Sequence, residues 1–241
     1  MITMPIRKVK GGYKWGSKGK VYRNRKDAER QAAAAYASGY KKSMSWFETL
    51  KRDNGGWIGE LNESKKKYLK MTPKLKVKIP EFKYPDEKTE IPKILDAMKN
   101  KKLKPTEMEE TDKKARNMLF GLVEDSEEKY KDLIRDLKIY TTKQKVKYNR
   151  KRPYQVTDKI NKPKTNTINT PSFPSGHSIE AFGVATVLGH KFPEKKEKLM
   201  ETAEKISNAR VEMGVHYHSD KKVGEQIGKI IGRAYIKERL S

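Results

Sequence analysis

The sequence predicts a mostly α-helical protein, with a helical bundle over residues 106–241 and a small basic appendage made of a β-hairpin and a helix. Apolar residues recur at helical intervals through the C-terminal half, and two short alternating segments near the start flank a glycine-containing turn. The hydrophobic fraction of 34% suffices for one core, but not for 241 packed residues. We therefore expect a basic N-terminal module (1–55), a Lys/Pro-rich linker or wrapping segment (56–105) and a helical domain (106–241).

The N-terminal module is predicted from its turn and capping residues. Residues 13–15 and 20–23 alternate in polarity and are joined by Gly-Ser-Lys-Gly, which is typical of a hairpin. Asn24 then precedes an alanine-rich stretch, residues 25–38, that ends before a glycine. This pattern predicts a helix capped by Asn24.

Positive charge is concentrated in the N-terminal part of the chain. Lys and Arg number 56 against 31 Asp and Glu, a net charge of +25, and residues 1–105 hold 28 of the basic side chains but only 11 of the acidic ones. Such an excess attracts polyanions, so we expect residues 1–55 to contact nucleic acid, a virion or an anionic membrane surface. Residues 11–40 resemble a basic module of tailed-phage virion proteins, which implies a viral, virion-associated protein. The alternative is an appendage that only stabilises the fold.

The segment over residues 56–105 is rich in Lys, Pro and Glu. Prolines at positions 73, 80, 85 and 92 predict that it contains no long helix, because proline lacks an N–H and clashes with the preceding turn. We also expect no second apolar core there.

The helical domain is predicted element by element from its apolar spacing. Residues 107–139 show helical periodicity that residues 121–126 divide into two helices, and further helices are expected over residues 175–190, 195–212 and 219–240. In the last helix, glycines recur every four residues, at Gly224, Gly228 and Gly232, and allow a close neighbouring helix. The apolar helix faces would also permit a homodimer.

The chain contains no cysteine, which excludes disulfides and thiolate metal sites. No apolar run approaches the roughly 20 residues that span a bilayer. Residues 1–10 carry basic side chains without a following apolar stretch, so they are not a secretory signal. We expect a soluble, cytoplasmic protein.

Three clusters of polar residues carry the chemistry. In chain order they are Lys145 with Arg152-Pro153, then Pro174-Ser175-Gly176-His177, then Arg210 with His216 and Asp220. A transferring phosphoryl group bears negative charge on its oxygens, which Lys145, Arg152 and Arg210 can neutralise. Ser175 and Gly176 open a predicted helix, whose free backbone N–H groups favour an anion.

The order and gaps of these clusters resemble the signature of the type 2 phosphatidic acid phosphatase (PAP2) and vanadium haloperoxidase superfamily. The resemblance implies a soluble, acid-phosphatase-like phosphoric ester hydrolase that cleaves a phosphomonoester or diphosphate through a phosphohistidine, without metal or cofactor. It implies that His216 is the nucleophile, held by Asp220, and that His177 is the acid. Ala209 departs from the family, which usually has serine before the third-cluster arginine.

The sequence is also compatible with two other functions. A vanadate-dependent haloperoxidase would use the same fold, with His216 as the vanadium ligand. A structural protein would bind nucleic acid or a virion and keep a vestigial pocket. Substrate identity is also open among lipid phosphates, isoprenoid diphosphates, nucleotides and sugar phosphates. Of the remaining histidines, we expect His190 to cap a helix and His218 to be exposed.

Overall fold

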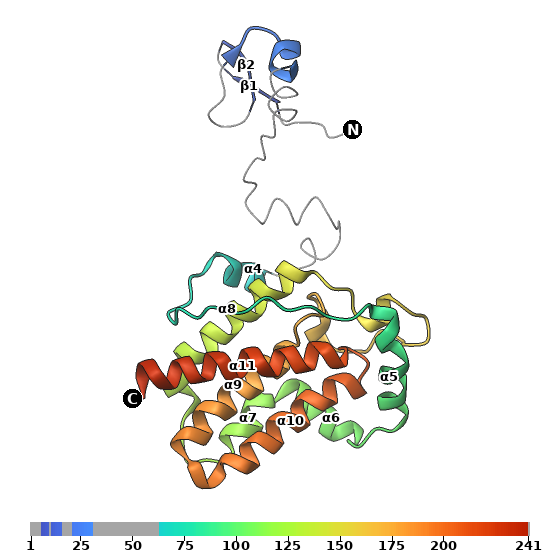
Figure 1. Ribbon diagram of the computed structural model, residues 1–241, viewed down its shortest axis with the longest axis vertical. Helices are drawn as coiled ribbons and strands as arrows, with labels where there is room; N and C mark the ends of the chain where they lie inside the picture. Colours follow the sequence, from blue (N-terminus) through green and yellow to red (C-terminus); the bar gives the residue numbers. More distant parts are fainter. Residues whose placement is uncertain (1–5, 10, 16–20, 31–62, 241) are drawn as a thin grey trace. The chain divides into compact units, whose positions relative to one another are not determined.

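The computed structural model divides into two compact units, residues 1–52 and 53–241 (Figure 1). It describes residues 6–9, 11–15, 21–30 and 63–240. The predicted continuation of the N-terminal helix, over residues 31–38, lies outside the described residues.

The first unit contains a three-stranded antiparallel sheet in the order β1-β2-β3, whose strands are β1 (Ile6–Val9), β2 (Gly12–Trp15) and β3 (Val21–Tyr22). Strands β2 and β3 form the predicted hairpin, with Tyr13 opposite Tyr22. Residues 25–30 are helical, and Asn24 Oδ1 accepts a hydrogen bond from the Asp27 N–H at 2.9 Å. The predicted cap is confirmed. Strand β1 was not predicted, because four residues with two central basic side chains give little periodicity.

The second unit is helical, which confirms the mostly α fold class. Its helices are α4 (Glu63–Lys70), α5 (Glu87–Lys99), α6 (Pro105–Lys113), α7 (Ala115–Phe120), α8 (Lys131–Tyr148), α9 (Gly176–Lys191), α10 (Lys196–Glu212) and α11 (His218–Arg239). No helix in the described part of the chain is long and apolar enough to cross a membrane.

Helix α9 is the centre of the core and contacts α7, α8, α10 and α11 (Figure 1). Its sequence is apolar on most sides, so Phe182, Val184, Val187 and Leu188 are all at most 2% exposed. A helix that is apolar around its circumference is stable only when neighbours cover it on every side.

The glycine series of α11 packs directly against α9. A Cβ atom on Gly224 would lie 2.7 Å from the Ser175 carbonyl oxygen, and one on Gly232 would lie 2.9 Å from the Gly183 carbonyl oxygen. The close approach predicted from the glycine spacing is confirmed. It brings the N-terminal ends of α9 and α11 together, and the Ser175 N–H donates to the Asp220 carbonyl at 3.0 Å.

Two expectations for residues 56–105 were wrong. Helix α5 runs for 13 residues with Pro92 inside it, and Ile91 and Ile94 belong to a second, small apolar cluster with Ile160, Val211 and Tyr217. Pro92 removes one intrahelical hydrogen bond in the second turn of the helix. Burial of the isoleucines, which tertiary packing alone provides, offsets that loss.

Residues 71–86 run in extended form along α8. Their backbone N–H groups bond to side chains on one face of that helix: Leu75 to Asp136, Val77 to Tyr140 and Phe82 to Tyr148, at 2.7–2.8 Å. This face of α8 therefore supplies partners for a stretch that has no secondary-structure hydrogen bonds of its own.

Candidate active site

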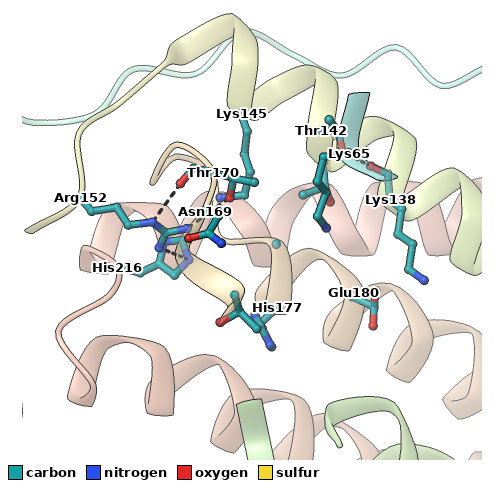
Figure 2. A pocket seen from close by; sticks show the side chains of 13 residues that line it. Lys65, Lys138, Thr142, Lys145, Arg152, Asn169, Thr170, His177, Glu180 and His216 are labelled. Carbon is teal, nitrogen blue, oxygen red and sulfur yellow. Dashed lines mark hydrogen bonds between the residues drawn. The ribbon is translucent and has the colours of Figure 1, made fainter. Parts of the chain in front are cut away.

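A cavity of about 220 Å³ opens between α4, α8, α9 and the loops that follow α8 and α10 (Figure 2). Five of the predicted site residues line it: Lys145, Arg152, Gly176, His177 and His216. The other three, Ser175, Arg210 and Asp220, are each 0% exposed and lie behind its wall. Three clusters that are distant in the chain are thus brought to one place.

Lys145 and Arg152 stand on either side of the end of α8. Lys145 lies in its last turn, and Asn149 ends the helix with a left-handed φ of 46°, so the chain turns sharply before Arg152. The Lys145 ammonium donates to the Pro171 and Ser172 carbonyls at 2.6 and 3.1 Å. These bonds tie the first cluster to the loop that carries the second.

Arg210 and His216 are joined through a tight turn after α10. Gly214 has a φ of 69°, a conformation that favours glycine, and reverses the chain there. The Val215 and His216 N–H groups then both donate to the Arg210 carbonyl at 3.2 Å. This turn explains the five-residue gap in the third cluster.

The His216 ring makes contacts through both nitrogens. Nδ1 lies 3.0 Å from Asp220 Oδ2, and Nε2 lies 3.3 Å from Arg152 Nη1. Because arginine can only donate, we assign the proton to Nδ1 and the lone pair to Nε2. Burial, then the charges of Arg152 and Lys145, hold the pKa of His216 well below its usual range, so the ring is neutral near pH 7.

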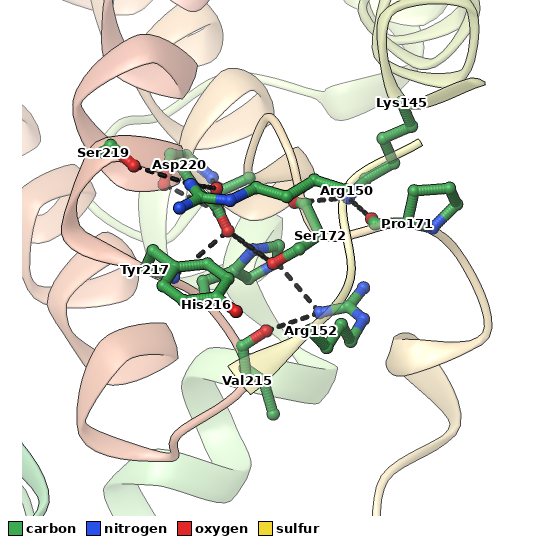
Figure 3. A network of polar contacts seen from close by, with 12 residues as sticks. Lys145, Arg150, Arg152, Pro171, Ser172, Val215, His216, Tyr217, Ser219 and Asp220 are labelled. Carbon is green, nitrogen blue, oxygen red and sulfur yellow. Dashed lines mark hydrogen bonds and ion pairs between the residues drawn. The ribbon is translucent and has the colours of Figure 1, made fainter. Parts of the chain in front are cut away.

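Asp220 is held by several donors besides His216 (Figure 3). It lies in the first turn of α11, where its Oδ2 accepts the Ser172 hydroxyl at 2.5 Å and the Tyr217 N–H at 3.1 Å. Its Oδ1 accepts from Arg150 at 2.8 Å. Burial raises the pKa of Asp220, and the guanidinium of Arg150 opposes that shift.

Arg150 connects Asp220 to a second buried carboxylate. Its guanidinium stacks between the rings of Tyr84 and Tyr217, 4.2 and 3.7 Å from their centroids, and donates to Glu90 Oε2 at 2.8 Å. Glu90, from α5, also accepts from the N–H and hydroxyl of Ser219. Behind His216, Asp220, Arg150 and Glu90 therefore form one chain of buried, hydrogen-bonded charges.

Arg210 and His177 share a partner in α6. Arg210 donates to the carboxylate of Asp112 and, at 2.8 Å, to the Thr167 hydroxyl. His177 Nε2 lies 3.1 Å from the Asp112 carbonyl oxygen. Burial, followed by the charge of Arg210, lowers the pKa of His177 to about 3, although the backbone contact with Asp112 opposes the shift.

Ser175 and Gly176 open α9 as predicted, but they face different ways. The Ser175 hydroxyl accepts the Ser178 N–H at 3.3 Å and the Ser178 hydroxyl at 2.9 Å, so it caps the helix and lies outside the cavity lining. Gly176 lines the cavity, and a Cβ atom there would lie 3.1 Å from Thr141 Cγ2 on α8. The helix start therefore presents backbone to the cavity.

The sequence profile of the PAP2 superfamily matches residues 137–238, which include all eight predicted site residues. Residues 137–238 belong to the PAP2 superfamily. A crystal structure described as the first bacterial vanadium-dependent iodoperoxidase resembles the chain with a TM-score of 0.53 and 16% sequence identity. The similarity covers 71% of this chain and 56% of that one, so this chain spans little more than half of that protein's length. At this identity the likeness shows the PAP2 fold alone.

Comparison with curated protein sequences gives no match. The PAP2 match does not extend to residues 11–40, so their resemblance to a virion module stays a prediction. The same holds for nucleic-acid, virion or membrane partners of residues 1–55, for a homodimer and for a cytoplasmic location.

Several residues that support the PAP2 site were missed in the sequence. Arg150 lies two positions before Arg152, but one more arginine carries no signal in a chain with 56 basic residues. Glu90 and Asp112 lie before the residues that match the PAP2 profile, and neither belongs to a spaced motif that could have indicated it. Ser172 lies three residues before Ser175. Its position beside the second motif cluster was the one sequence signal that could have identified it.

Both histidines of the PAP2 site make stability depend on pH. An unfolded histidine has a pKa of about 6.5, whereas burial lowers the pKa of His177 to about 3 and that of His216 well below 6.5. Below about pH 6.5 the unfolded chain thus binds more protons than the folded one. We expect the free energy of unfolding to fall as pH drops from 7.5 to 5, measured by urea denaturation. His177→Asn should flatten this slope and His218→Asn, at an exposed position, should not; equal slopes in all three proteins would contradict the assignment.

Proposed function

We propose that the PAP2 domain is a phosphatase that hydrolyses a phosphomonoester or diphosphate through a phosphohistidine at His216. One observation carries the proposal: a neutral imidazole, with its Nε2 lone pair beside Arg152 at 3.3 Å, lines a cavity that Lys145 and His177 share. A nucleophile, cations for an oxyanion and a second imidazole are the parts that this reaction needs.

In the first step, the Nε2 lone pair of His216 attacks phosphorus and the bond to the leaving oxygen breaks. The ring becomes positively charged, and Asp220 stabilises it through the Nδ1 hydrogen bond of 3.0 Å. Arg152 and Lys145 offset the charge on the phosphoryl oxygens. Arg210 contributes from behind the wall, where Asp112 and Thr167 hold it in place.

His177 is proposed to give the leaving oxygen its proton and then to take one from the water that attacks the phosphohistidine. A pKa of about 3 is too low for an acid near pH 7, and the charges of Arg210 and Lys145 contribute to that value. A phosphoryl dianion between these groups opposes their effect. Substrate binding therefore raises the pKa of His177, and a proton is taken up with the substrate.

The donors around the cavity, imidazole, guanidinium and ammonium, suit a tetrahedral oxyanion, and vanadate resembles phosphate in shape and charge. His216 would hold vanadate through Nε2, with Arg152 and Lys145 on its oxygens, and bound vanadate would supply peroxide activation. These side chains suit phosphate and vanadate equally. Phosphate release and halide oxidation are therefore distinguished by assay.

The purified protein is expected to release phosphate from phenyl phosphate in the presence of EDTA, because side chains supply the positive charge at the cavity. Vanadate should inhibit this release competitively, since it occupies the same cations. Iodide oxidation by the vanadate-loaded protein without any phosphate release would reject the proposal in favour of a haloperoxidase. Salt-sensitive nucleic-acid binding with neither activity would favour the structural protein.

A further inference from the structure

A second and larger groove borders the catalytic cavity. It has a volume of about 1230 Å³ and lies between α6, the loop before α6 and part of the loop between α8 and α9. Thr167 and Asn169 line both the groove and the catalytic cavity, and Figure 2 shows Asn169 at the end of the cavity where Arg152 lies. The next residue, Thr170, accepts a hydrogen bond from Arg152 Nε through its carbonyl at 2.9 Å. The groove therefore begins beside the proposed phosphoryl site.

Hydrogen bonds hold both walls of this groove. On one side, Glu212 at the end of α10 accepts from the N–H groups of Lys102 and Leu103, at 3.1 and 3.3 Å. On the other side, the Thr167 hydroxyl donates to Asp112 of α6 at 2.7 Å. The groove is thus preformed, which reduces the ordering cost of binding a ligand there.

The groove carries an excess of positive charge. The two carboxylates that line it are engaged, Glu109 by Lys113 at 2.6 Å and Asp112 by Arg210. Three further lysines line it at exposed positions: Lys101, Lys162 and Lys164. Within the described part of the chain, none of these three has a carboxylate at ion-pair distance. Their charge is available to an anionic ligand.

Size and lining together indicate the class of that ligand. Cavities for drug-sized ligands measure about 300–1,000 Å³, so this groove has room for a chain of several linked units. Its separate lysines suit phosphates that recur along a chain, and Leu103, Met108 and Met213 offer apolar contact to the groups between them. A single nucleic-acid strand combines these properties.

We propose that the substrate is a nucleic-acid strand with a terminal phosphate, whose end enters the catalytic cavity while the following nucleotides lie in the groove. This inference rests on the proposed phosphatase function. The bond from the terminal phosphorus to the sugar oxygen breaks as His216 attacks, and the strand leaves as a hydroxyl after taking a proton from His177. Water then releases inorganic phosphate from His216. Several nucleotides bridge the two sites, so Lys162 and Lys164 need not reach the scissile phosphate.

The test compares thymidine 5′-phosphate with a strand of ten thymidine nucleotides that carries a 5′-phosphate, because both present the same scissile group. We expect a higher kcat/KM for the strand. In a Lys162→Ala/Lys164→Ala variant, the value for the strand should fall about 3- to 10-fold, since two exposed phosphate contacts are lost. The value for thymidine 5′-phosphate should change less than about twofold. The corresponding 3′-phosphates test the other end of the strand.

The matched control is Lys76→Ala/Lys78→Ala, which also removes two exposed lysines that are two residues apart in a segment without regular secondary structure. Neither lysine lines the groove. The control should leave the ratio of the two kcat/KM values unchanged. Equal values for strand and nucleotide at both ends, or an equal loss in the variant and its control, would overturn the proposal.

Binding of an unphosphorylated strand separates this proposal from the phosphatase assignment, because binding needs no turnover. Fluorescence anisotropy of a labelled strand of ten thymidine nucleotides gives the slope of log Kd against log salt concentration. Each phosphate contact of a single strand contributes about 0.7 to this slope, so Lys162→Ala/Lys164→Ala should reduce it by about 1.4 relative to its control. A reduced slope supports the groove even if the wild-type protein releases no phosphate.

Equal slopes in the variant and its control would reject the groove as a strand-binding site, whether or not the protein is a phosphatase. Vesicles containing phosphatidylglycerol test the other polyanion that lysines attract. A variant that loses binding to these vesicles but keeps its affinity for the strand would assign the groove to a membrane surface and overturn the proposal.

Discussion

His216→Ala is expected to lower kcat for phosphate release by roughly 10⁴-fold or more, because it removes the atom that forms the bond to phosphorus. The wild-type protein, quenched during turnover, should carry acid-labile, base-stable phosphate on the peptide that contains His216. The alanine variant should carry none. Mass spectrometry of the quenched digests is the measurement.

His218→Ala is the matched control, since His218 lies two residues further on and is exposed. It should retain wild-type turnover. Near-normal thermal melting of His216→Ala would show that the loss is chemical rather than a failure to fold. Full activity of that variant, or trapped phosphate on His177 instead, would disprove the nucleophile assignment.

Arg150→Met is expected to lower the free energy of unfolding by about 3–5 kcal/mol, because it leaves two buried carboxylates without their cation. Asp220 and Glu90 both bind this guanidinium at 2.8 Å, and Arg150 is 1% exposed. Turnover should fall as well. Burial raises the pKa of Asp220 and Arg150 is the first of the groups that oppose this shift, so the pKa rises further without the arginine, and a protonated Asp220 is a poor acceptor for His216.

The loss in stability should shrink as pH falls. Arg150 lowers the folded-state pKa values of both Asp220 and Glu90, so its removal raises them; the cost is therefore largest at high pH and shrinks as the two groups take up protons. Urea denaturation at pH 7.5 and pH 5 measures this difference. Arg150→Met/Glu90→Gln should recover part of the stability, since one unpaired charge is removed.

Lys151→Met is the control for Arg150→Met, because it removes a neighbouring exposed charge from the same loop. It should change the free energy of unfolding by less than about 0.5 kcal/mol. A similar loss in both variants would show that the loop, rather than the buried Asp220–Arg150–Glu90 array, sets the stability.

Local features of the sequence were sufficient to predict the helices of the PAP2 domain and their close packing. Apolar spacing placed α9, α10 and α11 to within about one residue at each end, whereas α8 runs to Tyr148, beyond the predicted end at residue 139. The glycines of α11 indicated a neighbour at short distance. The motif order identified residues that line one cavity, among them Lys145, His177 and His216. Helix positions and close packing depend on residues near one another in the chain, so periodicity and spacing reveal them. The distant site residues were indicated by the family resemblance of their motifs.

Proton positions and long-range partners were decided by the tertiary structure alone. Asp112 meets Arg210 across 98 residues, and Glu90 meets Arg150 across 60. The Ser175 hydroxyl turned inward to cap α9, which spacing could not show. A pKa depends on burial and on nearby charges, so the lowered pKa of His216 follows only from a structure that buries the ring and packs Arg152 and Lys145 around it.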